Sequence, residues 1–414
     1  MSTTILVIGL LVFFAHFLSL QFRKTHIPDV LILTLLGILM GPVFGFVSQG
    51  DFGRVGSLFA TIALVVILFE GGTAIDMKVL SKSLATTSKL ALGCLVSTSV
   101  IVALIGFYVL GLEVLPSAML GLILGSTSPA VVIPLVNSLR LSEKPTTVLV
   151  LESALSDVLS IIGVFALLQI FLHGEVEPGR LVGEILAAMI FAAVIGALGG
   201  IGWLLVLGKV RDFPNTISST LAYVFIVYGL TELLGFSGPI ASLALGITLT
   251  NFEKFGLHRI PSIDRNLVPL NEIDKAFYGE AVFLLKTYFF IYLGISIEFG
   301  DINLAVVAIS MVFMVYAMRI LFTRFIFSDP VYSLRDASFV SMMGPKGLAS
   351  AVLATLPLKY GVPGGEMIRD VTFMVVMISI TLTAVLVMSY PGGFTQRLYA
   401  KTLKKPLVSE TLEP

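Results

Sequence analysis

The sequence has very few of the residues that soluble proteins use for crosslinks, metal sites and solvation. It contains one cysteine, one tryptophan and four histidines in 414 residues, and charged residues make up 13%. The single cysteine, Cys94, excludes a disulfide within the chain and a cysteine-based metal cluster. The 26 basic and 26 acidic residues cancel, so no net charge attracts nucleic acid. Soluble domains carry about 25% charged residues, so this scarcity argues against a soluble enzyme.

Apolar residues dominate the chain instead. They make up 57% of it, and the mean hydropathy is +1.01. A water-soluble fold of this length could not bury so much apolar surface, so we expect an all-α polytopic membrane protein. Stretches of roughly 20 mostly apolar residues, the length of a spanning helix, occur about thirteen times. They cover residues 4–22, 28–47, 57–75, 86–111, 115–138, 146–172, 182–207, 217–234, 236–251, 277–298, 302–327, 335–358 and 368–390.

Lysine and arginine are distributed unevenly between the two sets of loops. The loops that follow odd-numbered stretches hold 19 of these residues, and those that follow even-numbered stretches hold 4. Because cytoplasmic loops are enriched in lysine and arginine, we predict a multi-pass protein of the plasma (inner) membrane with its N-terminus outside. We expect residues 1–392 to form one transmembrane domain and residues 393–414 a short cytoplasmic tail.

Seven charged residues fall inside the predicted spans, where each is unfavourable by about 2.5–3.5 kcal/mol on insertion scales. Such residues persist where they pair or face a water-filled path, so they are the first functional candidates. Two of them, Lys286 and Glu232, receive no role from the sequence. The seven are Glu70, Glu152, Asp157, Glu232, Lys286, Arg319 and Lys346.

Helix-breaking residues interrupt the fifth and the twelfth stretch at mid-depth, at residues 125–129 (GSTSP) and 344–347 (GPKG). Proline either kinks a helix or, beside glycine, allows it to unwind. The two stretches cross the membrane in opposite directions, and paired interruptions of this kind indicate the inverted repeats of a secondary transporter. We therefore expect two crossed broken helices, with Ser128 and Lys346 partly neutralising the opposed helix ends.

The sixth stretch carries two carboxylates on different faces. Residues four apart share a helix face, so Ser153 lies with Asp157 and Ser156 lies with Glu152. A carboxylate with a hydroxyl one turn away is a small oxygen site of the kind that hard cations prefer. The same carboxylate can bind a proton instead, so one group can exchange H⁺ for a metal ion. The alternative is a buried acid that stabilises the fold through hydrogen bonds.

Several short segments, taken in order, carry a family resemblance. Their order and spacing resemble the monovalent cation:proton antiporter family, in particular its sodium/proton exchanger (NhaP-like) branch, over nearly the whole chain. The segments read PDVLILTLLGILMGP, LVVILFEGG, GSTSPAVVIPLV, ESALSDVLSI, SGPIASLALGITLTN, FFIYLGISIE, MRIL and GPKGLASAVLA.

The resemblance implies a role for each candidate residue. Asp157 is the carboxylate that is alternately protonated and cation-bound, and Ser153, Glu70 and Thr127 complete a monovalent-cation site. Glu152 forms a structural ion pair with Lys346, and Arg319 compensates charge. Helices at about 86–172 and 302–390 form a transport core that moves against a scaffold at about 1–75 and 182–298. Members of the family form homodimers through the scaffold.

Three positions depart from the family pattern. Ser128 stands where aspartate is usual, Ser156 stands where asparagine is usual, and Lys346 replaces arginine. We keep Ser128 and Ser156 in the predicted transport site. With Ser156, one exchangeable carboxylate remains on this helix, which favours electroneutral exchange of one H⁺ per cation.

The prediction is therefore an antiporter that needs no cofactor and is not an enzyme. Na⁺ is the expected cation, and K⁺ or Li⁺ remain open. The first alternative is a K⁺/H⁺ antiporter or a cation channel of the same fold. The second is an intramembrane aspartyl protease, for which Glu70 and Asp157 are the candidate pair.

Overall fold

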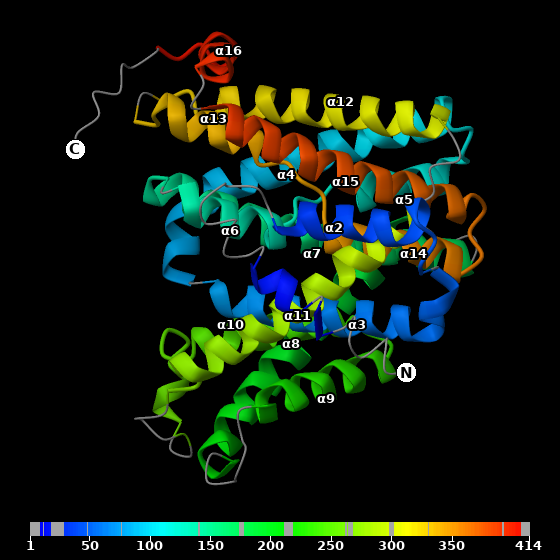
Figure 1. Ribbon diagram of the computed structural model, residues 1–414. Coiled ribbons are helices and arrows are strands. Elements are labelled where there is room, and N and C mark those ends of the chain that lie inside the picture. Colours follow the sequence, from blue (N-terminus) through cyan, green and yellow to red (C-terminus); the bar gives the residue numbers. More distant parts are fainter. Residues whose placement is uncertain are drawn as a thin grey trace. The chain divides into compact units, whose positions relative to one another are not determined.

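The computed structural model describes the greater part of the chain, and its regular elements over these residues are helices (Figure 1). The described residues are 9–10, 12–17, 29–47, 49–75, 77–139, 141–173, 178–210, 218–260, 263, 268–297, 302–329, 331–390 and 393–406. The α-helices are α2 (Asp29–Ile38), α3 (Gln49–Ala74), α4 (Met77–Tyr108), α5 (Val114–Ile123), α6 (Pro129–Leu139), α7 (Glu143–His173), α8 (Pro178–Val210), α9 (Ser219–Leu233), α10 (Gly238–Thr250), α11 (Glu272–Ile295), α12 (Ile302–Ile326), α13 (Leu334–Met342), α14 (Leu348–Lys359), α15 (Gly365–Ser389) and α16 (Phe394–Leu403).

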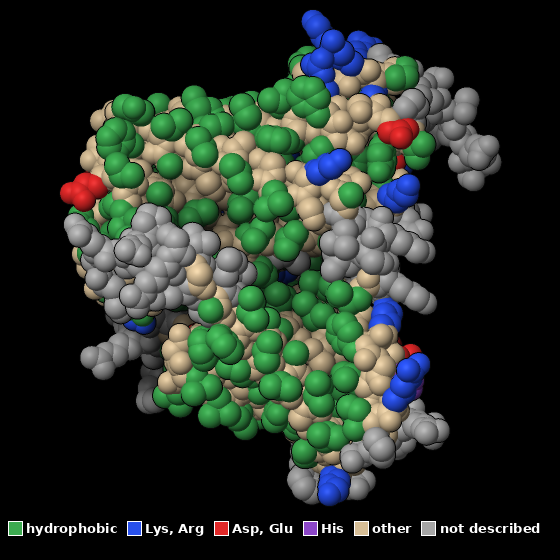
Figure 2. All heavy atoms as spheres, turned by 180° about the vertical axis from the view of Figure 1, so that it is seen from behind, with side chains coloured by type: hydrophobic (Ala, Val, Ile, Leu, Met, Phe, Trp, Pro, Cys, Tyr) green, Lys and Arg blue, Asp and Glu red, His purple; other side chains and the backbone are tan. Residues whose placement is uncertain are grey.

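The length and surface of these helices suit a lipid environment. Within the described residues, six helices are long and apolar enough to cross a membrane, and six shorter apolar helices accompany them. Large apolar side chains lie on the outside, such as Phe313 and Phe325 on α12, which are 61% and 70% exposed. Figure 2 shows such side chains spread over the visible face of the molecule. Apolar surface of this extent is expected to face lipid rather than water.

The predicted spans from 28–47 onward each overlap observed helices. The stretch at 115–138 contains both α5 and α6, and the stretch at 335–358 contains both α13 and α14. Most of the first stretch, 4–22, lies outside the described residues, so the count of thirteen stays a prediction. The tail contains a helix that was not predicted, α16.

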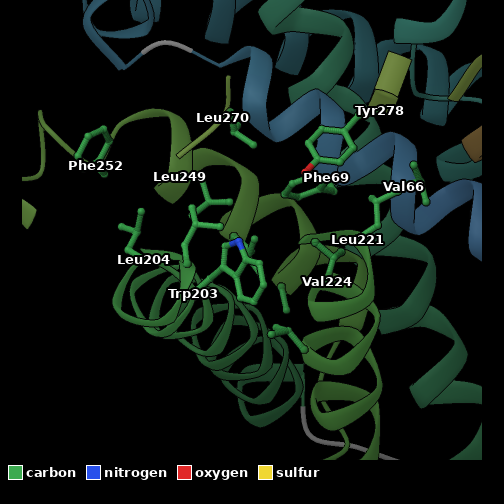
Figure 3. Packing of buried hydrophobic residues seen from close by; sticks show 14 of the residues in the cluster. Val66, Phe69, Trp203, Leu204, Leu221, Val224, Leu249, Phe252, Leu270 and Tyr278 are labelled. Atoms are coloured by element: carbon green, nitrogen blue, oxygen red, sulfur yellow. The ribbon is translucent and has the colours of Figure 1, made fainter. Parts of the chain in front are cut away.

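The chain forms two compact units. Unit 1 consists of residues 1–52, 83–168 and 290–414, and unit 2 consists of residues 53–82 and 169–289. A cluster of buried apolar side chains from α3, α8, α9, α10 and α11 forms the interior of unit 2 (Figure 3). At its centre the ring of Trp203 stacks on Tyr223 with 4.6 Å between ring centroids, and its Nε1 donates to Thr220 Oγ1.

Glycines allow α3 and α10 of unit 2 to approach closely. A Cβ atom added to Gly72 would collide with the backbone of Leu243, and one added to Gly246 would collide with Phe69. The buried side chain of Asn251 then ties the ends of the two helices together, because its Nδ2 donates to the carbonyl of Ile75 at 2.7 Å. Glycine at both contact points therefore fixes the spacing of this pair.

In unit 1, α15 packs along α12 and α14, and α14 also contacts α5 (Figure 1). The N-terminal part of α7 belongs to the same unit. Unit 1 therefore contains both interrupted segments and the helix that carries Glu152 and Asp157.

Candidate functional site

The site is built around two unwound segments that meet each other. Helix α5 ends at Ile123 and α6 begins at Pro129, while α13 ends at Met342 and α14 begins at Leu348. Between the paired helices the chain is not helical, so each break is an unwinding rather than a simple kink. The amide of Ser128 donates to the carbonyl of Pro345 at 2.8 Å, which joins the two breaks directly.

Hydroxyl groups on neighbouring helices satisfy the backbone amides that the breaks release. The amide of Thr127 donates to Ser156 Oγ on α7 at 3.1 Å, and the amide of Lys346 donates to Ser379 Oγ on α15 at 2.9 Å. Unwound backbone at membrane depth persists only when protein groups or a wet cavity satisfy it. Ser156 and Ser379 therefore support the two breaks.

Glycine is required where the breaks touch. A Cβ atom added to Gly347 would collide with both Oγ and Cβ of Ser128. The residue before α14 thus has no side chain because the first break occupies that space.

Lys346 sends its side chain from the second break into the first. Its buried ammonium donates to the carbonyl of Ser126 at 2.8 Å. A cation near the C-terminal end of α5 compensates the partial negative charge there. The same Ser126 has its hydroxyl beside Asp157 and 3.3 Å from Ser350 Oγ on α14. Lys346 therefore lies at the expected helix end and acts electrostatically on Asp157.

The structure corrects the predicted partner of Glu152. We predicted an ion pair with Lys346, but Arg319 takes both carboxylate oxygens of Glu152, through Nη1 at 3.1 Å and Nη2 at 3.0 Å. Both side chains are buried, with 0% of Glu152 and 3% of Arg319 exposed. Arg319 provides the planar fork that a bidentate contact requires, whereas a lysine ammonium does not. Lys346 is instead engaged by the carbonyl of Ser126.

Further hydrogen bonds complete the environment of this pair. Thr127 Oγ1 donates to Glu152 Oε1 at 3.1 Å, and Arg319 Nε donates to the carbonyl of Val340 on α13 at 2.9 Å. The pair thus connects α7, α12, α13 and the first break. These contacts compensate the negative charge of Glu152, so this charge has a structural role.

Asp157 lies on the same helix as Glu152, but the surroundings of its side chain differ. It is 5% exposed, and none of the ion pairs within the described residues includes it. One turn earlier, the buried Ser153 donates its hydroxyl proton to the carbonyl of Val150 at 2.9 Å. The Ser153 hydroxyl therefore uses its proton within the helix and keeps lone pairs as oxygen ligands.

The structure assigns Ser156 to the support of the first break. Its hydroxyl accepts from Thr127 and donates to the carbonyl of Ser153 at 3.1 Å. Ser128, also predicted for the site, is buried and contributes its amide to the contact between the breaks.

Glu70 belongs to unit 2, on α3, where it is partly buried. Lys286 of α11 acts on it electrostatically, and the Lys286 ammonium lies 5.9 Å from the centroid of the Phe283 ring.

Glu232 lies at the start of α10, where its Oε1 accepts a hydrogen bond from the amide of Gly238 at 2.8 Å. A carboxylate at a helix N-terminus is favourable, so Glu232 caps α10.

Sequence reasoning missed three hydroxyl residues that contact this cluster. Ser126, Ser350 and Ser379 are buried and bond to each other or to Lys346. For Ser126 a signal existed, because it lies inside the predicted break. Ser350 and Ser379 lie in apolar helices, where no local pattern distinguishes them from other serines.

Comparison with known proteins identifies the family. The model of the sodium/hydrogen exchanger transmembrane domain matches residues 9–388. The chain belongs to the sodium/hydrogen exchanger family. It is therefore a multi-pass membrane protein from a family of transporters rather than enzymes, as the resemblance predicted.

Relatives and solved structures agree with this assignment. The chain is 27% identical over 398 residues to the K(+)/H(+) antiporter NhaP of Alkalimonas amylolytica, and 25% identical over 367 residues to the K(+)/H(+) antiporter NhaP2 of Shewanella sp. (strain ANA-3). These alignments cover 92% and 86% of this chain but only 64% and 61% of the relatives. The fold is similar to the sodium proton antiporter MjNhaP1 of Methanocaldococcus jannaschii, with a TM-score of 0.69, 21% identity and coverage of 93% and 99%.

Proposed function

We propose that this chain is a secondary antiporter that exchanges a monovalent cation for H⁺, with Asp157 as the carboxylate for which the two ions compete. The observation that carries the proposal is the contrast between the two acids of α7. Arg319 compensates Glu152, whereas Asp157 lies buried next to the broken helices and takes part in none of the described ion pairs. A carboxylate in that position gains from binding either a proton or a cation.

The proposed cation ligands within unit 1 are Asp157, Ser153 and Thr127. Ser153 suits this role because its proton is already donated to Val150, which leaves oxygen lone pairs for a cation. For Thr127 the proposed ligand is the carbonyl oxygen, since its amide and its hydroxyl bond to Ser156 and Glu152. Monovalent cations are hard ions, and all three ligands offer oxygen.

Na⁺ is the proposed cation and K⁺ is the second candidate. The similar fold belongs to a sodium proton antiporter, which supports Na⁺. The curated relatives at 27% and 25% identity are named K(+)/H(+) antiporters, which supports K⁺. The exchange is electroneutral in this proposal because Ser156 replaces a second titratable group and serves the first break instead.

Transport is proposed to proceed by alternating access. The core helices at about 86–172 and 302–390 move against the scaffold at about 1–75 and 182–298, and Asp157 faces each side of the membrane in turn. Inverted repeats would place the two breaks at corresponding points of the core. In the proposed arrangement the N-terminus is outside, the C-terminus is cytoplasmic and the protein is a homodimer.

Ion flux in proteoliposomes tests this function. With the membrane potential clamped, an outward Na⁺ or K⁺ gradient is expected to drive H⁺ into the vesicles and acidify their lumen, and no acidification is expected without the cation. Asp157→Asn is expected to reduce this flux to the level of empty vesicles. Ser160→Ala, a buried change one turn along the same helix, is the matched control and is expected to keep the flux. Cation movement without coupled proton movement would instead indicate a channel.

A further inference from the structure

The short helix α16 presents an outward face that the transport site does not use. On one side of the helix, Thr395, Tyr399, Ala400 and Leu403 are buried. On the other side, Phe394 is 78% exposed and Leu398 is 47% exposed. These two residues are four positions apart, so they lie on one face of the helix. An apolar pair in this position is unfavourable in water.

Basic side chains lie beside this apolar pair. Arg397, Lys401 and Lys404 are exposed, and Arg397 and Lys401 are again four positions apart. The helix sequence, FTQRLYAKTL, contains no acidic residue. Figure 2 shows Lys and Arg side chains clustered at the end of unit 1 where α16 lies. The outward face thus combines apolar contact area with positive charge.

Contacts at both ends fix α16 against the rest of unit 1. At its start, Ser389 Oγ of α15 lies 2.7 Å from Thr395 Oγ1. Just after its end, the Lys405 ammonium donates to the carbonyls of Asp329 and Tyr332 at 3.0 Å and 2.6 Å, in the turn between α12 and α13. The helix is therefore held in one orientation beside α13.

The position of α16 along the chain places it at a membrane surface. The long apolar helix α15 ends at Ser389, and α16 begins at Phe394. A connection of four residues cannot carry the helix far from the end of the span. A helix with exposed Phe and Leu on one face and Lys and Arg beside them is the type that lies in the headgroup region of a bilayer.

We propose that the outward face of α16 docks on anionic phospholipid headgroups, with Phe394 and Leu398 inserted at the acyl boundary and Arg397, Lys401 and Lys404 bound to phosphate. Positive charge near an anionic surface strengthens such binding, and salt weakens it. This binding does not depend on the proposed transport function, since it needs only the folded protein in a bilayer.

Tryptophan quenching by brominated phospholipid tests the proposal. Phe394→Trp places a fluorophore on the outward face, and wild type supplies the blank because its one tryptophan, Trp203, is buried. Phe313→Trp on the exposed side of α12 gives the value for full lipid contact. In brominated vesicles that contain phosphatidylglycerol, we expect the Phe394→Trp signal to fall at least about twofold.

Removal of charge supplies the second arm of the test. Arg397→Gln, Lys401→Gln and Lys404→Gln together are expected to abolish the extra quenching that phosphatidylglycerol gives over phosphatidylcholine alone. Lys254→Gln with Lys275→Gln, two exposed lysines of unit 2, is the matched control and is expected to keep it. Quenching of Phe394→Trp no greater than the blank would overturn the proposal, and is the result expected if a protein or a second copy of the chain covers this face. Equal quenching with and without phosphatidylglycerol would also overturn it.

Discussion

At the residue scale, the decisive feature is the division of labour between the two acids of α7. Three donors engage Glu152, two from the guanidinium of Arg319 and one from the hydroxyl of Thr127. Asp157 is also buried, but the groups described as acting on it are the hydroxyl of Ser126 and the charges of Lys346 and Glu152, and none of the described ion pairs includes it. One carboxylate is therefore a fixed anion of the fold, and the other can change its ligand.

The Glu152–Arg319 pair is expected to show strong energetic coupling. Removing one partner of a buried pair leaves an uncompensated charge and destabilises a protein by about 3–5 kcal/mol. Glu152→Gln and Arg319→Gln should therefore each lower the unfolding midpoint in detergent, and the double variant should lower it less than the sum of the two. A second cycle with Glu152→Gln and Lys346→Gln serves as the comparison. The coupling energy between these two residues should be smaller because no direct bond joins them. A cycle with no coupling between 152 and 319 would contradict the structure.

The sequence could locate the charged residues but not their partners. Glu152, Arg319 and Lys346 are recognisable because charge is rare inside apolar spans. Arg319 and Lys346 are both buried near the acids of α7, so the sequence allows either to pair with Glu152. Which of them does so depends on which side chain points toward Glu152. Arg319 extends from α12 and also bonds to Val340, while Lys346 is diverted to the carbonyl of Ser126. That choice follows from tertiary packing, which no local pattern encodes.

At the scale of elements, the two breaks act as one unit. The amide of Ser128 bonds to Pro345, and Gly347 leaves the space that Ser128 fills. Proline with glycine in the same short segment made both interruptions predictable from the sequence. The hydroxyl groups that support them came from α7 and α15, and these were not predictable because serine is common in membrane helices. Helix α16 was missed because it is short and amphipathic rather than continuously apolar.

A pair of substitutions at the crossing point tests this contact. Gly347→Ala is expected to destabilise the protein by about 1–3 kcal/mol, because the new methyl group meets Ser128. Ser128→Gly removes both colliding atoms, so it should restore the unfolding midpoint in the Gly347→Ala background. Gly229→Ala in α9, where an added Cβ meets nothing within 4 Å, is the matched control. An effect of Gly347→Ala no larger than that of the control would show that the breaks are not in close contact.

At the scale of the whole molecule, we expect exchange that the membrane potential does not drive. Ser156 stands on α7 where a second exchangeable acid would make the exchange electrogenic, and its hydroxyl is committed to Thr127 and Ser153. One proton then moves against one cation, and no net charge crosses the membrane. An imposed potassium–valinomycin potential should leave the Na⁺-driven proton flux unchanged. A clear dependence of rate or endpoint on the potential would contradict one-for-one exchange.

The most direct test of the central claim is the number of protons released when a cation binds. If cation and proton compete for Asp157, binding of one Na⁺ or K⁺ to the purified, protonated protein should release about one proton. Calorimetry in buffers of different ionisation enthalpy measures this number. Wild type and Ser160→Ala should give about one proton per bound cation, and Asp157→Asn should give none. Cation binding without proton release in wild type, or the same release in Asp157→Asn, would contradict the claim.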